Sequence, residues 1–422
     1  MKLNMTKWAS AFSLAAILSG PPVFAQRRVD GLNGLIQLLV ERNPQLRAYQ
    51  RISEAESRAA RAEGTLPNPT IGFGLRNVGW NRLSVGEEMM SGVVAEVSQS
   101  VPFPGKLALR RSSAMVRASR SREAVRESRL RLIREAKELY AEIFYYQRIR
   151  DLLQEKRSVL QEALGFAQAR FAVGQVPQAD LFKAQLEISE TDVMVLDAEQ
   201  MLGSLQARLS ALVALPAESV VVVARELPLG SLPYSFPELE ERARSANPLL
   251  TQARLQVAEE SLAVRLARKD FLPDFMLRAG LMYRGPFRDM YEGMVGVEAP
   301  LYFWKKERDR LAAETLRLEG TRLGAQDLEN RIRAELKQYF VVAKSAETKN
   351  LLYRDQLIPQ AERSLQAALS RYQVGQIDLL PVLSAVDTLI TYRTESARIL
   401  TDLWTAIARL EELTGLEILV GR

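Results

Sequence analysis

The residue types available for chemistry are restricted in this chain, because its 422 residues include neither cysteine nor histidine. Thiolate nucleophiles, disulfides, imidazole bases and zinc sites built from these residues are therefore excluded within one chain. No carboxylate pair, glycine-rich phosphate loop or nucleophile elbow stands in a context that predicts an enzyme. We expect no catalytic residue, no cofactor and no metal site.

Composition also narrows the class of protein. With 47% hydrophobic and 26% charged residues, the chain is predicted to be neither disordered nor a polytopic helical membrane protein. The formal net charge of +6 is too small to indicate a nucleic-acid partner. The most basic run, between Arg110 and Arg134, is interpreted as the solvated or tunnel-lining face of a long helix.

The first 25 residues have the pattern of a secretory signal peptide. Lys2 and Lys7 accompany an apolar stretch, and Val23-Phe24-Ala25 supplies a small-residue cleavage pattern before Gln26. The apolar stretch is shorter than the ~20 residues that a transmembrane helix needs. We therefore expect residues 1–25 to be a cleaved signal and the rest to be exported.

The remainder of the chain is duplicated. Three motifs return in the same order after 204, 206 and 201 residues. The pairs are Asn43-Pro44 with Asn247-Pro248, Leu66-Pro67 with Leu272-Pro273, and Arg170–Gln175 with Arg371–Gln376. A stretch with three prolines and a glycine separates the copies. The sequence therefore predicts a first repeat over 26–226, a linker over 227–237 and a second repeat over 238–422.

Long helices are expected within each repeat, after one helix and a strand hairpin. Residues 106–172 contain no proline and one glycine, which predicts a helix over 105–172 of about 100 Å, followed by another over 178–215. Apolar residues recur every seven positions from Leu181 to Leu209, and this period returns from Val382 to Leu410. A sustained seven-residue period indicates coiled packing between neighbouring helices.

The segments between the helices alternate with a period of two. Hairpins are predicted over 67–103 and 273–303, where apolar residues such as Ile71 and Phe73 alternate with polar ones. The charges on the polar face are Arg76, Glu96, Asp274, Arg278 and Glu298. Each strand has ~10 residues, the length of a tilted strand that crosses a bilayer. A half-buried sheet in a soluble domain shows the same alternation.

The export signal and the strand ends favour the membrane interpretation. Phe103 and the run Tyr302–Trp304 lie at strand ends like an interfacial aromatic belt. Open sheet edges are not tolerated in lipid, so the four strands of one chain require further copies. Two chains would give a barrel filled by side chains, and three would leave room for water. A channel therefore predicts a trimer or a larger ring.

Together these features resemble the TolC-like outer-membrane efflux protein family over essentially the whole mature chain. The resemblance rests on the duplicated Phe/Tyr-x-Val-Gly-Gln turns, the two hairpins and the long helices. Leu66–Pro69 and Ser98–Lys106 look most like the heavy-metal-exporter branch. The family implies a mainly α fold with β: two structural repeats, a trimeric α-barrel of long coiled helices, and a 12-stranded transmembrane β-barrel with four strands per chain.

The same resemblance implies function and location. Such a protein is a passive conduit in the cell outer membrane that extends into the periplasm. Its partners are a homotrimer of itself, a periplasmic adaptor (membrane fusion) protein and an inner-membrane pump of the RND or ABC type. Heavy-metal cations or drugs are the expected cargo.

The resemblance also implies a gate at the helical turns. Asp180 is expected to accept a hydrogen bond from Tyr372, and Asp378 and Asp387 are candidate constriction acids. The adaptor is expected to dock on the turn residues Val173, Gly174, Gln175, Val374, Gly375 and Gln376.

The chain departs from the family pattern at the gate. Ile377 stands where related channels carry a gate arginine, and Pro381 and Ser384 stand where acids line the constriction. An alternative from another class is a soluble periplasmic coiled-coil adaptor or scaffold of a transport complex. That class normally carries one helical hairpin rather than two related halves.

Overall fold

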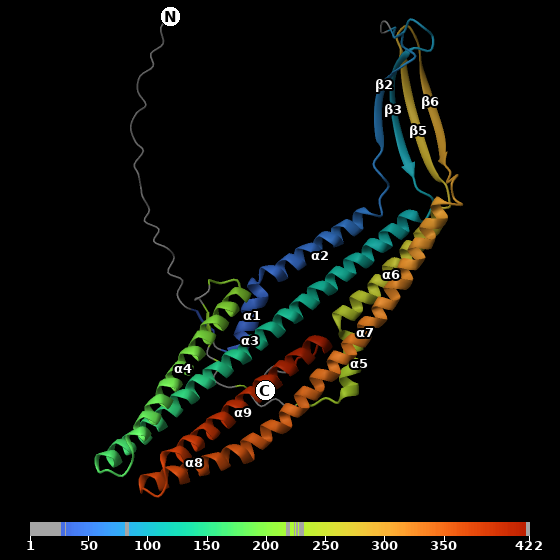
Figure 1. Cartoon of the computed structure of the whole chain (residues 1–422). Helices are drawn as coiled ribbons and strands as arrows, with labels where there is room; N and C mark the ends of the chain where they lie inside the picture. Colours follow the sequence, from blue (N-terminus) through green and yellow to red (C-terminus); the bar gives the residue numbers. More distant parts are fainter. Residues whose placement is uncertain are drawn as a thin grey trace, which may run out of the picture.

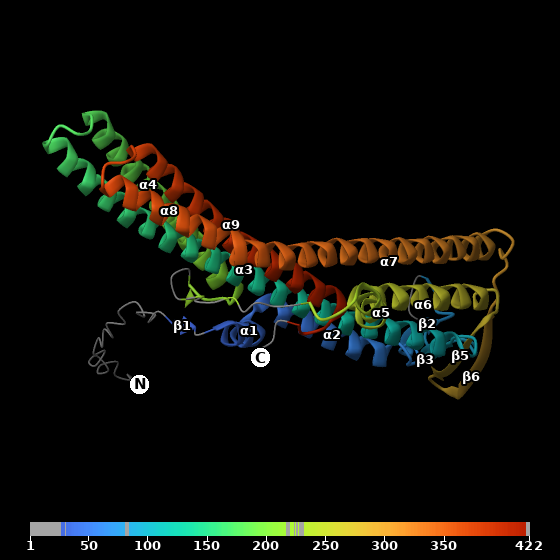
Figure 2. The same cartoon turned by 90° about the horizontal axis from the view of Figure 1, so that it is seen from below.

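The computed structural model of the chain describes residues 27–29, 31–80, 84–216, 220–222, 224, 227 and 232–418. The predicted signal peptide lies outside these residues, and the predicted linker lies partly outside them. The molecule is elongated, with a four-stranded sheet at one end and two helical turns together at the other (Figures 1 and 2).

Long helices dominate the order of elements. In sequence they are β1 (Arg27–Val29), α1 (Gly31–Arg42), α2 (Pro44–Ala62), β2 (Thr70–Arg76), β3 (Gly92–Val101), α3 (Lys106–Ala172), α4 (Gln178–Leu212), β4 (Val220–Val222), α5 (Phe236–Ala246), α6 (Pro248–Lys269), β5 (Asp274–Arg284), β6 (Phe287–Glu298), α7 (Lys306–Leu352), the π-helical turn η1 (Tyr353–Leu357), α8 (Ile358–Gln373) and α9 (Leu379–Thr414). The predicted mainly helical fold with two repeats is confirmed.

The two Asn-Pro motifs explain how each repeat begins. Asn43 and Asn247 end a short helix and cap the next one, so the single first helix expected in each repeat is two helices. The side-chain oxygen of each asparagine accepts a backbone N–H of the new helix, as a helix N-cap does. Its amide donates to the carbonyl of Leu212 in the first repeat, at 2.8 Å, and of Leu413 in the second, at 2.9 Å. Each motif therefore ties the first helices of a repeat to its last helix.

The sheet has the order β2-β3-β5-β6, and all its pairs are antiparallel. The two hairpins thus join through β3 and β5, while β2 and β6 form the edges of the sheet. A separate parallel pair, β1 with β4, was not anticipated from the sequence.

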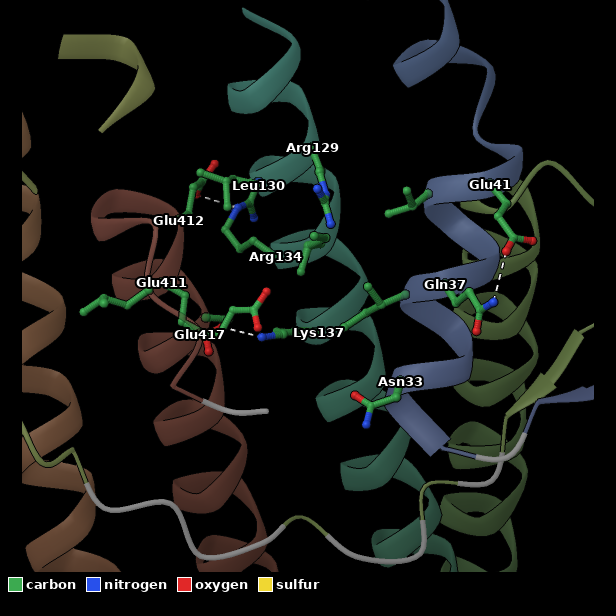
Figure 3. Close-up of a pocket in the computed structure, with 15 residues that line it drawn as sticks. Asn33, Gln37, Glu41, Arg129, Leu130, Arg134, Lys137, Glu411, Glu412 and Glu417 are labelled. Atoms are coloured by element: carbon green, nitrogen blue, oxygen red, sulfur yellow. Dashed lines mark hydrogen bonds and ion pairs between the residues drawn. The ribbon is translucent and has the colours of Figure 1, made fainter. Parts of the chain in front are cut away.

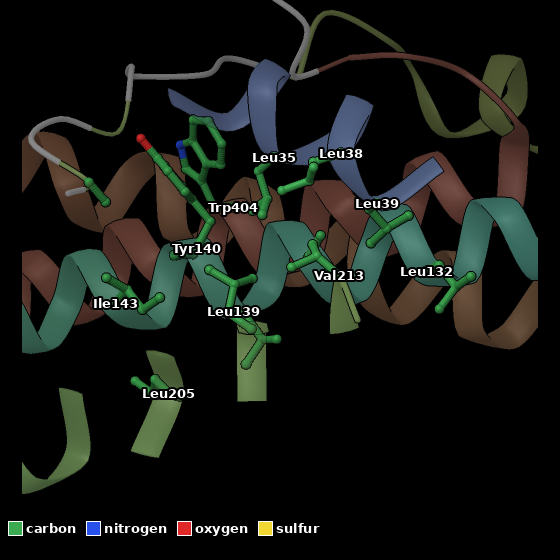
Figure 4. Close-up of a cluster of buried hydrophobic side chains, with 14 of the residues drawn as sticks. Leu35, Leu38, Leu39, Leu132, Leu139, Tyr140, Ile143, Leu205, Val213 and Trp404 are labelled. Carbon is green, nitrogen blue, oxygen red and sulfur yellow. The ribbon is translucent and has the colours of Figure 1, made fainter. Parts of the chain in front are cut away.

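The hydrophobic core lies where the helices of the two repeats cross. Leu35 and Leu39 of α1 pack with Tyr140 of α3 and Trp404 of α9, and Leu205 of α4 belongs to the same cluster (Figure 4). A second cluster of the same kind lies between α5, α7 and α9. Because α3 contacts α2, α4, α6 and α9, it is the central rod of the molecule.

The rod formed by α7 and α8 is interrupted by η1, which lies just before Pro359. Proline lacks the N–H that would continue the α-helical hydrogen bonds, and a π-turn is one local solution. Tyr353 of this turn packs edge-on against Tyr392 of α9, with ring centroids 5.9 Å apart.

Among the described residues, no helix combines the length and the apolar character needed to cross a membrane.

Candidate functional site

The sheet presents two chemically different faces. Its register places Arg76, Glu96, Arg278, Asp274 and Glu298 on one face, as expected from the alternation. The other face is apolar and exposed: Ile71, Phe73, Tyr291, Val295 and Val297 are 59 to 84% accessible. A contiguous exposed apolar face of this kind marks a surface that lipid or another protein covers.

The polar face is concave. Arg76 of β2 and Glu292 of β6 lie at opposite edges of the sheet, yet their side chains form an ion pair at 2.5 Å. Such a contact requires the sheet to curl around its polar side. A second pair, Arg278 with Glu96 at 3.8 Å, lies on the same face. The charges that were predicted to face a lumen are thus partly neutralised by one another.

Asp274 lies at the base of this face and has a different role. Its carboxylate accepts the backbone N–H of Phe103 at 2.7 Å and the ammonium of Lys106 at 2.9 Å. Lys106 is only 3% exposed, so this contact anchors the start of α3 to β5. Glu298 lies opposite Asp274 in the register and is exposed.

The strand ends carry the expected aromatic residues. Tyr302, Phe303 and Trp304 follow β6, are all more than half exposed, and contact one another through their ring edges. Phe103, at the end of β3, lies under the ammonium of Lys269 at 5.4 Å. This arrangement suits the boundary between hydrocarbon and water.

At the other end of the molecule, the two helical turns have the same backbone. In each one, glycine adopts a positive φ (74° at Gly174 and 79° at Gly375). The N–H of the next residue donates to a carbonyl five positions back, Gln175 to Arg170 and Gln376 to Arg371, both at 2.9 Å. This is the Schellman arrangement that ends a helix and satisfies its last carbonyls. The valines before the glycines, Val173 and Val374, are each 68% exposed.

Tyr372 is the most buried residue of the predicted gate. Its side chain is fully buried, and its hydroxyl makes no hydrogen bond with any residue that the structure describes. Burial raises the pKa of this phenol; Arg170 opposes the shift, and the carboxylates of Asp180 and Asp378 add to it. The structure therefore brings Asp180 and Asp378 near Tyr372 without the predicted Tyr–Asp hydrogen bond in the single chain.

Asp387, the remaining predicted gate acid, lies within α9, farther from the helical turn than Asp378. Its carboxylate forms an ion pair with Lys156 of α3 at 2.8 Å, and Lys156 also lies 3.5 Å from Glu187 of α4. Although burial opposes it, these two acids raise the pKa of Lys156. Asp387 is thus part of a link between three helices.

Sequence reasoning missed two cations that join these helices. Arg170 of α3 lies over the ring of Tyr372, and Arg393 of α9 pairs with Glu155 of α3 and Glu362 of α8, both at 2.6 Å. Arg170 was noted only as part of the repeated motif. Because its partner lies 202 residues away, no local pattern could have indicated the contact.

A charged cluster lies beside a cavity of 380 Å³ that is lined by α1, α3 and α9 (Figure 3). Lys137 and Glu411 form a buried ion pair there, at 2.5 Å, and Arg134 pairs with Glu412 at 2.8 Å. Burial raises the pKa of Glu412, although Arg134 and Arg409 oppose the shift. These contacts hold α3 against α9. Over the described ranges, no group of acids is arranged to hold a metal ion.

Comparisons with known proteins agree with this geometry. The family model of the outer membrane efflux protein matches residues 35–215 and 239–416, one segment within each predicted repeat. The cobalt-zinc-cadmium resistance protein CzcC of Cupriavidus metallidurans is 25% identical over 259 residues, which are 59% of each chain. The chain thus spans about three fifths of the length of this relative.

Solved structures of outer-membrane channels share the fold. The channel OprN superposes with a TM-score of 0.81 at 16% identity, covering 92% of this chain and 90% of that one. The outer membrane protein VceC of Vibrio cholerae gives 0.77 at 17% identity, covering 91% and 96%. MtrE of Neisseria gonorrhoeae, solved in an open state, gives 0.76 at 15% identity, covering 91% and 88%.

Proposed function

The chain belongs to the outer membrane efflux protein family, and on that premise we propose that it is the outer-membrane channel of a tripartite export system. It conducts cargo passively from the periplasm to the outside, and a partner pump supplies the energy. The observation that carries this proposal is the curved sheet at the end of the helical rod. Its polar side is concave, and its apolar side carries exposed side chains such as Phe73 and Val295.

The working unit is a homotrimer. Within the part of the chain that the structure describes, β2 and β6 have no partner at the two edges of the sheet, and an open edge is not tolerated in lipid. Joining β6 of one copy to β2 of the next is a head-to-tail contact, which generates a ring when the rotation closes. Three copies supply twelve strands and a water-filled interior. The helices would also meet neighbouring copies on two sides, because α4 and α7 lie on opposite flanks of α3 and α9 (Figure 1).

The helical turns are the periplasmic end of the channel. Asp180, Tyr372, Asp378 and Asp387 form the gate region, and the exposed turn residues receive the periplasmic adaptor. The exposed valines Val173 and Val374 support this docking surface. An inner-membrane pump of the RND or ABC type completes the system.

The cargo follows from the relatives rather than from a site. CzcC carries the name of a cobalt-zinc-cadmium resistance protein, and we propose heavy-metal cations, with drugs as the second candidate class. The pairing of Arg76 with Glu292 and of Arg278 with Glu96 leaves little net charge on the polar face. We therefore expect Arg76, Glu96, Asp274, Arg278 and Glu298 to bias ions weakly rather than to bind them.

A soluble periplasmic adaptor or scaffold is the competing function. It accounts for long helices, but its strands would cover a dry core. Here the apolar side of the sheet is exposed instead, and Phe73 is 80% accessible.

A matched pair of charged substitutions on β6 tests the channel. Val295→Arg places a charge on the apolar side and Met294→Arg places one on the polar side, one residue apart. Near the bilayer midplane an arginine facing lipid costs about 2–4 kcal/mol. We expect Met294→Arg to assemble as a heat-modifiable membrane trimer with pore conductance, and Val295→Arg to lose membrane insertion. Recovery of the wild-type protein as a monomer that needs no detergent would reject the channel.

A further inference from the structure

One cation reaches from the first helical hairpin onto the second at the tip of the molecule. Arg170, in the last turn of α3, donates from Nη1 to the carbonyl oxygen of Tyr372 at 3.4 Å. The carbon of its guanidinium lies 5.2 Å from the centre of the Tyr372 ring. One side chain thus contacts both the backbone and the ring of a residue 202 positions away.

The Arg170 contact lies at the C-terminal end of α8. The carbonyl of Tyr372 also accepts the N–H of Gly375 at 3.1 Å within the turn that ends this helix. A Cβ added at Gly375 would lie 3.5 Å from Nη2 of Arg170, so the guanidinium rests directly on the turn. A positive charge at a helix C-terminus is favoured by the helix dipole. Planar stacking of arginine on an aromatic face adds a cation–π attraction.

The repeat supplies an internal comparison. Arg371 stands 201 residues after Arg170 in the matching motif, but its side chain is exposed. No other lysine or arginine occurs within residues 171–182 or 372–382. Arg170 and Arg371 are therefore the cations nearest to the two turns in sequence, and of these two Arg170 contacts the opposite hairpin.

The surroundings of Tyr372 agree with a cation-based link rather than a hydroxyl-based one. Asp180, in the first turn of α4, and Asp378, at the start of α9, are the acids whose charges add to the rise in the pKa of the Tyr372 phenol. Neither acid makes a hydrogen bond with the buried Tyr372 hydroxyl, and Arg170 is the group that opposes the rise of its pKa.

We propose that Arg170 is the latch of the periplasmic gate. It holds the α8–α9 hairpin against the α3–α4 hairpin through the carbonyl and the ring of Tyr372, and the tyrosine hydroxyl is dispensable. This proposal rests on the proposed channel function. Arg170 is a positioning residue, because it acts through its contacts with Tyr372.

Single-channel conductance in planar bilayers tests the latch with four variants. Arg170→Ala removes the contact, and we expect about a tenfold rise in the open-to-closed ratio, as for the loss of one charged hydrogen bond. Arg371→Ala, the matched control, should behave like the wild type. Tyr372→Phe should also be unchanged, since the ring and the carbonyl remain. Arg170→Lys should recover part of the closed state.

The outcomes separate the latch from the channel. A wild-type protein without any pore would refute the channel function itself. A conducting wild type with Arg170→Ala equally closed would overturn the latch. An open Tyr372→Phe would also overturn it and assign closure to the hydroxyl.

A second readout covers poor assembly of Arg170→Ala. Hydrogen exchange at the amides of Gly375 and Gln376 should accelerate in this variant, while exchange at Gly174 and Gln175 should not change. Equal exchange in both turns would contradict the proposal even if no pores were recorded.

Discussion

The turn after α3 and the turn after α8 have the same backbone and opposite surroundings. Both end their helix with a glycine of positive φ and the same pair of hydrogen bonds. The aromatic residue that precedes each turn differs in burial: Phe171 is 43% exposed, whereas Tyr372 is fully buried. The arginines beside them differ the other way round: Arg170, beside the exposed Phe171, contacts the other hairpin, whereas Arg371, beside the buried Tyr372, is exposed.

The difference shows that the two repeats share the backbone of the turn but not its burial. Hydrogen bonds within a turn depend only on local sequence, so both copies keep them. Burial depends on the neighbouring helices: Tyr372 packs in a buried cluster with Leu160 and Ala163 of α3 and Leu379 of α9, whereas Phe171 lies outside this cluster. The second turn is therefore held by the first repeat, and the first turn is free to face other molecules.

The largest effect is expected from truncating the two aromatic residues. Tyr372→Ala removes a fully buried ring, for which about 3–5 kcal/mol is typical, and Phe171→Ala removes a partly solvated one at no more than about 1 kcal/mol. Hydrogen exchange at each hairpin measures the free energy of local opening. Equal losses for both variants would remove the asymmetry on which the comparison depends.

An intermediate and equal effect is expected from the glycines. An L side chain at a positive φ costs about 1–2 kcal/mol, so Gly174→Ala and Gly375→Ala should destabilise their turns alike. The exchange rates of the Gln175 and Gln376 amides report this directly. A cost confined to one turn would mean that the shared backbone is not an independent unit.

The smallest effect is a pH dependence confined to the second turn. The pKa of Tyr372 is raised by burial above its ordinary value of 10.0, so the folded state retains a proton that the unfolded chain loses. The neutral phenol leaves closure unchanged below pH 10, and ionisation of the buried phenol weakens closure as the pH rises further. Conductance recorded from pH 9 upward should increase more in the wild type than in Tyr372→Phe, which lacks the proton. Parallel curves for the two proteins would argue against this titration.

Much of the fold could be predicted from patterns within short stretches. The absence of proline predicted a helix over 105–172, and α3 spans Lys106–Ala172. Strict alternation predicted the two faces of the sheet, because the side chains of a strand point to opposite sides. The Asn-Pro motifs were identified as repeats, but their capping role needed the structure, since the partners Leu212 and Leu413 are distant in sequence.

The gate was less accessible to sequence reasoning for the same physical reason. Asp180 was expected to accept a hydrogen bond from Tyr372; its charge acts on the phenol, but the chain shows no such hydrogen bond. Which of the two related arginines would be buried with them depends on the packing of α3 against the α8–α9 hairpin. The partners of Asp387 and Arg393 are also set by packing between distant helices. Resemblance to the family indicated the region, and only the packing assigned the contacts.

The π-turn at Tyr353–Leu357 sets how α8 is rotated about its own axis relative to α7. A turn with i→i+5 bonds takes up one residue more than an α-helical turn, and one residue corresponds to about 100° of rotation about the axis. The stripe that α8 presents to α9 is therefore offset from the stripe that α7 presents to α6 and α9. Deleting one residue here would swing Tyr372 off the guanidinium of Arg170, although the two sites lie more than a dozen residues apart along the rod.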